Sequence, residues 1–186
     1  MDLGGIIPPL PTPFAGDRVD IHRFRENLEH WIGWEGMSVP VGPGPFRLSG
    51  VVVAGSNGEA PLLEQEEVDA LVKVAREVVP SDRLLLVGTG RESTAGARFA
   101  SRRAADLGAD AVLVGTSNYF RRQLRNDDLI AHFEAVAAAV PVPVIMYSVP
   151  RFAGFDIPVA AIKRLASNPA IAGIKDSSGD TGRVVE

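Results

Sequence analysis

The sequence predicts an α/β protein whose parallel sheet closes as a (β/α)8 TIM barrel, with the first six βα units present and the last two missing. Three observations support this prediction. Short apolar runs rich in β-branched residues alternate with helical patterns, roughly every 30 to 40 residues along a chain of 186. The runs are apolar at nearly every position, as strands covered on both faces must be. No glycine motif of a nucleotide-binding open sheet follows the first run.

The predicted strands are the six apolar runs, and five helical patterns lie between them. The strands cover residues 6–7, 50–54, 84–88, 111–115, 144–147 and 171–175. The helical patterns begin at residues 20, 64, 93, 126 and 158. Asp20, Ser93 and Asn126 can cap the helices that they begin, and a proline fits the first turn of the last one. The face that the first helix is expected to bury carries Phe24, Leu28, Trp31 and Ile32.

The sequence favours a closed barrel over an open, doubly wound sheet. Gly88-Thr89-Gly90 is only a short glycine pair, which usually marks a tight turn from strand to helix. Residues 8–14 include four prolines, so this segment has few backbone N–H groups with which to bind a phosphate. Residues 39–45, rich in glycine and proline, are expected to form a surface loop before the second strand.

Composition excludes several classes of partner and cofactor. The chain has 19 Lys and Arg against 23 Asp and Glu, a net charge of −4, and offers no basic face for nucleic acid. Without cysteine it has no disulfides and no thiolate metal site. No apolar run approaches the roughly 20 residues of a membrane span. We therefore expect a cytoplasmic protein with a single catalytic domain, residues 1–186, that binds neither membranes nor nucleic acid.

The strand ends contain the candidate reactive residues, because reacting groups gather at the carboxyl ends of the strands in parallel barrels. Lys175 ends an apolar run, so its amine is expected in a confined site. Desolvation there favours the neutral amine, which can attack a carbonyl carbon and form an imine. A strand-end lysine whose amine reaches water is the alternative from position alone.

Two further strand ends provide partners for this lysine. Tyr147 ends the neighbouring run and can transfer protons while an imine forms, although an amphipathic rim residue would have the same position. After the second strand, the glycines of Gly55-Ser56-Asn57-Gly58 allow close backbone approach. Ser56 and Asn57 of this loop can hold a carboxylate. An ordinary loop before a capped helix is the alternative there.

With their flanking residues, these positions resemble the dihydrodipicolinate synthase/N-acetylneuraminate lyase family of Schiff-base (class I) aldolases. The matching strings run in family order across essentially the whole chain: Gly5-Ile6-Ile7-Pro8-Pro9, Thr12-Pro13-Phe14, Gly55-Ser56-Asn57-Gly58-Glu59, Tyr147-Ser148-Val149-Pro150 and residues 173–180. The resemblance implies a (β/α)8 barrel whose members join or cleave pyruvate and an aldehyde without a metal or organic cofactor. It also implies a homo-oligomer, a tetramer or dimer, for a full-length chain.

The resemblance implies catalytic roles for Lys175, Tyr147 and Tyr119 and substrate-binding roles for Gly55, Ser56 and Asn57. Lys175 would form the imine, and Tyr147 would relay protons. Ser56 and Asn57 would bind the carboxylate of the 2-oxo acid. In the synthases an aromatic residue completes the relay from a neighbouring subunit; Tyr119 corresponds to it, although Phe120 can occupy the same place.

One difference from the synthases concerns the aldehyde substrate. The synthases place an arginine two residues after their Val-Pro, where it grips the second substrate; this chain has Phe152 there and an arginine at Arg151. The strings are most similar to those of 4-hydroxy-2-oxoglutarate aldolases, which release pyruvate and glyoxylate. We expect that activity first and, as the alternative, 4-hydroxy-tetrahydrodipicolinate synthase of lysine biosynthesis. Because such barrels take about 250 residues, an inactive or regulatory truncated barrel is a further alternative.

Two motif matches point to other enzymes. Ala54-Gly55-Ser56-Asn57-Gly58 fits a relaxed nucleophile elbow, but a serine hydrolase needs a histidine on a later loop. All three histidines (His22, His30 and His132) fall within helical patterns, which disfavours that enzyme. His132-Phe133-Glu134 matches part of the zinc deaminase motif, but the chain has no cysteine to complete the ligands. We expect a helix face there, and no metal site.

Overall fold

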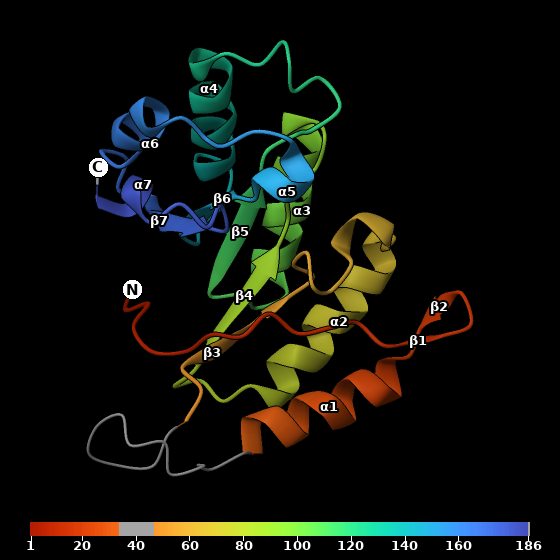
Figure 1. The fold of residues 1–186 in the computed structure, drawn as a ribbon. Helices are drawn as coiled ribbons and strands as arrows, with labels where there is room; N and C mark the ends of the chain where they lie inside the picture. The colour runs from red at the N-terminus through yellow and green to blue at the C-terminus, as the bar shows by residue number, and fades with distance from the viewer. Residues whose placement is uncertain (34–46, 186) are drawn as a thin grey trace. The chain divides into compact units, whose positions relative to one another are not determined.

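The structure, a computed structural model, describes residues 1–33 and 47–185, so the loop predicted at 39–45 lies outside it. The chain forms two compact units. The first comprises Met1–Val87 with Leu107–Asp110, and the second comprises Gly88–Asp106 with Ala111–Glu186. Each unit contains parallel strands and the helices that pack on them (Figure 1). That all of residues 1–186 act as one catalytic domain stays a prediction.

The first unit is built on the parallel strands β3 (Gly50–Val53) and β4 (Leu84–Gly88), paired from Gly50 with Leu84 to Val53 with Val87. Helices α1 (Ile21–Gly33) and α2 (Gln65–Val78) lie side by side (Figure 1). The short strands β1 (Phe14–Ala15) and β2 (Arg18–Val19) form an antiparallel hairpin, and η1 (Ala60–Leu62) is a 3-10 turn. No pattern in the sequence predicted these three short elements.

The first predicted strand, residues 6–7, is wrong as a regular strand. The chain there runs beside β3, where Val52 N donates to Pro8 O and Leu10 N donates to Val52 O, both at 2.9 Å. Pro9 forms an isolated bridge with Val52. Pro8 and Pro9 have no N–H to donate, so a continuous ladder cannot form. The segment therefore follows the path of a strand without its regular pairing.

The second unit contains three parallel strands in the order β5 (Ala111–Gly115), β6 (Val144–Ser148) and β7 (Ile171–Asp176). Helix α4 (Asn126–Ala137) contacts both α3 (Thr94–Asp106) and α6 (Val159–Leu165) (Figure 1). The one-turn helices α5 (Pro150–Ala153) and α7 (Gly182–Val185) follow the ends of β6 and β7 and were not predicted. All three strands lie where the apolar runs predicted them.

Two of the three predicted helix caps are confirmed. Asp20 Oδ1 accepts from Arg23 N at 2.9 Å, and Ser93 Oγ accepts from Gly96 N at 3.0 Å. The predicted cap at Asn126 is wrong by one residue: Arg125 precedes the helix, and its N–H donates to Asp128 Oδ2 at 2.9 Å. An acidic side chain in the first turn therefore replaces the expected cap.

The core prediction for α1 is correct except at one residue. Phe24, Leu28 and Ile32 are buried, whereas Trp31 is 42% exposed at the edge of the apolar face. None of the described helices combines the length and apolar character that a membrane crossing requires.

Candidate active site

The structure brings Lys175 and Tyr147 together at the carboxyl ends of β7 and β6. The two residues are register partners in adjacent parallel strands, so their side chains leave the same face of the sheet. The Lys175 Nζ lies 3.9 Å from the centroid of the Tyr147 ring. Tyr147 is buried, with 8% exposed, and Lys175 is half-buried. The face of an aromatic ring attracts a cation, so this contact holds the amine at the strand ends.

Asp176, the residue after Lys175, lies on the opposite face of β7 because side chains alternate along a strand. Its Oδ1 accepts from Ser178 N at 2.7 Å, and its Oδ2 lies 3.4 Å from Arg183 Nε. Burial raises the pKa of Asp176, but the hydrogen bonds with Ser178 and the charge of Arg183 outweigh it, and the pKa lies below its ordinary value. These contacts therefore fix the Asp176 carboxylate on the face of β7 opposite Lys175.

The predicted carboxylate-binding loop follows β3 in the first unit. It turns tightly: Gly58 N donates to Gly55 O and Glu59 N donates to Ser56 O, each at 3.1 Å. Ser56 is half-buried and Asn57 is exposed. These residues and Lys175 belong to different units, so the carboxylate-binding roles of Gly55, Ser56 and Asn57 stay predictions.

Buried contacts hold this loop in place, and the residues on either side of it have a strained backbone. Thr12, a buried residue whose role was not predicted from the sequence, donates through Oγ1 to Gly58 O at 2.7 Å. A Cβ at Gly58 would lie 3.0 Å from Leu10 O, so a side chain there would crowd the backbone. Ala54 and Glu59, on either side of the loop, have φ of 51° and 55°. Such left-handed non-glycine residues persist where the surroundings enforce them, and they cluster at functional sites.

Tyr119, the predicted relay residue from a neighbouring subunit, is 77% exposed in the loop between β5 and α4. Its ring packs edge-to-face on Phe120, with the centroids 4.9 Å apart. The N–H groups of Asn118 and Tyr119 donate to the carboxylate of Glu92 at 3.1 Å, so Glu92 holds this loop. The role of Glu92 was not predicted from the sequence, and the relay role of Tyr119 stays a prediction.

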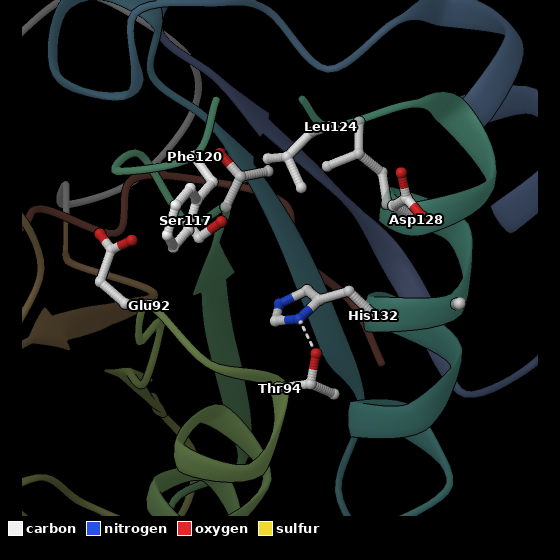
Figure 2. A pocket seen from close by; sticks show the side chains of 10 residues that line it. Glu92, Thr94, Ser117, Phe120, Leu124, Asp128 and His132 are labelled. Carbon is white, nitrogen blue, oxygen red and sulfur yellow. Dashed lines mark hydrogen bonds between the residues drawn. The ribbon is translucent and has the colours of Figure 1, made fainter. Parts of the chain in front are cut away.

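A cavity of about 500 Å³ lies in the second unit beside this loop, lined by residues of α4, by the first residue of α3 and by the loops that follow β4 and β5. Figure 2 shows the His132 side chain reaching from α4 into it, with Nδ1 2.9 Å from Thr94 Oγ1. Burial lowers the pKa of His132, so its imidazole is neutral near pH 7. Neither Lys175 nor Tyr147 lines this cavity. The sequence did not predict it.

These contacts of His132 support neither of the other motif matches. The serine hydrolase alternative pairs a histidine with Ser56, but His132 hydrogen-bonds to Thr94. In the part of the chain that the structure describes, no group of three or more His, Cys, Asp or Glu side chains is arranged to hold a metal ion.

A family model described as the dihydrodipicolinate synthetase family matches residues 2–186 of this chain. The chain belongs to this family. The resemblance inferred from the sequence is thereby confirmed. Solved structures of family members also confirm the barrel fold, because they superimpose on nearly the whole chain.

Three relatives show the extent of the similarity. The chain is 38% identical to the 4-hydroxy-tetrahydrodipicolinate synthase of Xanthomonas campestris pv. campestris over 185 residues, covering 99% of this chain and 57% of that protein. The structure of the same enzyme from Methylacidiphilum fumariolicum SolV matches with a TM-score of 0.86 and 32% identity, covering 98% of this chain and 57% of the other. The dihydrodipicolinate synthase from Acinetobacter baumannii, solved with pyruvate, matches with a TM-score of 0.83 and 34% identity, covering 98% and 58%. The chain thus spans a little over half the length of these relatives.

Proposed function

We propose that this chain carries the imine-forming residues of a carbon–carbon lyase that joins or cleaves pyruvate and an aldehyde. The observation that carries the proposal is the contact between Lys175 Nζ and the Tyr147 ring at adjacent strand ends, in a chain of this family. The pyruvate complex of the Acinetobacter baumannii relative supports pyruvate as the first substrate.

The proposed chemistry needs a proton carrier, because the ammonium form that the ring face attracts must give up a proton before the amine can attack a carbonyl carbon. The Lys175 amine attacks the keto carbon of pyruvate, and the carbinolamine loses water to give an imine. The protonated imine withdraws electrons, so the methyl group of pyruvate loses a proton; the resulting enamine attacks the aldehyde carbon, and the aldehyde oxygen takes up a proton. Water then hydrolyses the new imine and releases the product. Tyr147 carries protons in the addition and dehydration steps, while Ser56 and Asn57 hold the carboxylate of pyruvate.

Two candidate reactions differ in the aldehyde. The names of the relatives favour 4-hydroxy-tetrahydrodipicolinate synthase over 4-hydroxy-2-oxoglutarate aldolase. This order is the reverse of the one that the motifs predict, in which the aldolase comes first and the synthase is the alternative. Phe152 favours the 4-hydroxy-2-oxoglutarate aldolase, because an apolar ring stands where the synthases have an arginine. Phe152 is 61% exposed, and the Arg151 guanidinium lies 5.9 Å from its ring centroid. We take the synthase as the first candidate and the aldolase as the second.

Trapping of the imine tests the shared chemistry. The sequence has only three lysines, Lys73, Lys163 and Lys175, so an adduct can be assigned without ambiguity. After incubation with pyruvate and reduction with borohydride, peptide mass spectrometry should find the adduct on Lys175 alone. Lys175→Arg is the control and should remove it. Folded protein in which Lys175 stays unmodified would contradict the proposal.

The same protein distinguishes the two aldehydes. Condensation of pyruvate with aspartate semialdehyde identifies a synthase, and release of glyoxylate from 4-hydroxy-2-oxoglutarate identifies the aldolase. For a synthase, the rate with aspartate semialdehyde should exceed the glyoxylate release rate at equal substrate concentration. The reverse order would favour the aldolase. We also propose that the protein assembles as a dimer or tetramer, as the role expected for Tyr119 requires.

A further inference from the structure

Arg183 connects the ends of β6 and β7 through contacts that involve the residues next to Lys175 and Tyr147 in the sequence. It projects from α7, and its side chain is only 16% exposed. Its Nε lies 3.4 Å from Asp176 Oδ2 and 3.8 Å from Asp156 Oδ1. Its Nη2 donates to the carbonyl oxygen of Ile157 at 2.7 Å. One guanidinium therefore faces two carboxylates and a backbone carbonyl from two segments of the second unit, residues 156–157 and the end of β7.

These contacts close into a ring that includes both strand ends. The N–H of Ile157 donates to the Oγ of Ser148 at 3.3 Å, and Ser148 is 1% exposed. Ser148 is the register partner of Asp176, and its carbonyl oxygen accepts from Ser177 N at 2.8 Å. The contacts thus lead from Ser148 through Ile157 and Arg183 to Asp176, and the strand pairing returns to Ser148.

The ring lies immediately next to the reactive pair in sequence. Tyr147 precedes Ser148, and Lys175 precedes Asp176. β7 pairs with β6 as far as Asp176, and this pairing is one attachment of its carboxyl end. Arg183 supplies a second attachment through Asp176. Loss of that attachment allows the end of β7 to shift relative to β6.

The burial of these charges makes the loss of one partner more costly here than in an exposed ion pair. Arg183 and Asp176 are each 16% exposed at the side chain. Exposed ion pairs contribute little to stability, whereas removal of one partner from a buried pair leaves an uncompensated charge. The Oδ1 of Asp156 is buried with no hydrogen-bond partner in the described residues, and Arg183 provides the nearby positive charge.

We propose that Arg183 is a positioning residue for imine formation, acting through Asp176 and Ile157 to hold the Lys175 amine against Tyr147. The proposal rests on the proposed function and adds to it a residue that does not touch the substrate. A displacement of about 1 Å of a reacting group can cost up to roughly a hundredfold in rate. Weakening of this ring should therefore slow imine formation more than it weakens pyruvate binding.

Arg183→Met removes the charge and the donors while keeping an apolar side chain. We expect the rate of borohydride-trapped imine formation on Lys175 to fall about tenfold, with the pyruvate concentration for half-maximal rate changed less than twofold. Arg183→Lys retains a cation that can reach one acceptor, and should recover part of the rate. Arg164→Met, which changes an exposed arginine on α6 of the same unit, is the matched control and should leave the rate unchanged.

A second measurement does not depend on pyruvate. Limited acylation with acetic anhydride, mapped by mass spectrometry, reports the reactivity of Lys175 relative to Lys73 and Lys163 in the same sample. In Arg183→Met this ratio should rise several-fold, because the amine leaves the Tyr147 ring. If the parent protein forms no imine but the ratio changes as expected, the proposed function fails, and what stands is that Arg183 holds the Lys175 amine against the Tyr147 ring.

Parental imine rate and parental acylation ratio in folded Arg183→Met would overturn the proposal. Circular dichroism establishes folding. If Arg183→Met does not fold, the milder Arg183→Lys decides between the outcomes. An intermediate imine rate in that variant supports positioning, and a parental rate rules it out.

Discussion

Tyr147 combines two properties that act on Lys175 in different ways. The face of its ring attracts the ammonium form of the lysine, a contact worth about 0.5 to 2 kcal/mol depending on solvent exposure. Its hydroxyl is the only part that can carry a proton. The 3.9 Å distance from Nζ to the ring centroid describes the first property. A substitution that keeps the ring and removes the hydroxyl therefore separates them.

Tyr147→Phe should lower kcat by roughly a hundredfold or more, the usual contribution of a positioned proton carrier. Reduction with borohydride should still trap pyruvate on Lys175, because the ring contact remains. Tyr147→Leu removes both ring and hydroxyl and should also change the acylation of Lys175. Steady-state kinetics and adduct mapping measure the two effects. An unchanged kcat in Tyr147→Phe would exclude the relay role.

The elements show where local sequence is sufficient and where it is not. The runs at 84–88 and 111–115 form strands with the predicted bounds, because a buried parallel strand needs only a short, continuously apolar segment. The run at 6–7 does not, because Pro8 and Pro9 remove the donors that a ladder requires. The one-turn helices α5 and α7 are too short to show a helical period in sequence.

Close packing between β3 and β4 depends on Gly50. A Cβ at this position would lie 2.3 Å from the carbonyl oxygen of Leu84, its register partner. Gly50→Ala should therefore lower the free energy of unfolding by about 2 to 3 kcal/mol, since neither backbone can move easily in a packed sheet. Gly33→Ala, at the exposed end of α1 with nothing within 4 Å, is the control. Urea unfolding measures the stability of both variants, and an unfolding midpoint of Gly50→Ala equal to that of the parent protein would contradict this account.

At the scale of the whole molecule, the residues with predicted roles belong to two compact units. Lys175 and Tyr147 lie in the second, and Ser56 and Asn57 lie in the first. The family model and the barrel structures, in contrast, match nearly the whole length of the chain. Stability is also a property of the whole molecule, and buried titratable groups make it depend on pH.

His132 should make the protein less stable in mild acid. Burial lowers the pKa of His132, so its imidazole binds a proton less readily in the folded protein than in the unfolded chain, where a histidine has a pKa near 6.5. As far as this residue is concerned, the free energy of unfolding is therefore highest above about pH 6.5 and falls as the pH drops below that value. His132→Gln should reduce the loss of unfolding free energy between about pH 6.5 and 5. Exposed His30→Gln is the control; an unchanged slope in His132→Gln would refute the account.

The sequence alone determined the fold class, the family and the identity of the two residues now found in contact. Apolar periodicity, prolines and strand-end residues are local signals, and Lys175 stands out because it ends an apolar run. The tertiary structure alone decided which distant residues support those positions. Thr12 reaches Gly58, Glu92 holds the loop of Tyr119, and Arg183 reaches Ile157. Their partners lie 46, 27 and 26 residues away along the chain. No local pattern specifies such pairs, because they depend on where packing brings separate segments together.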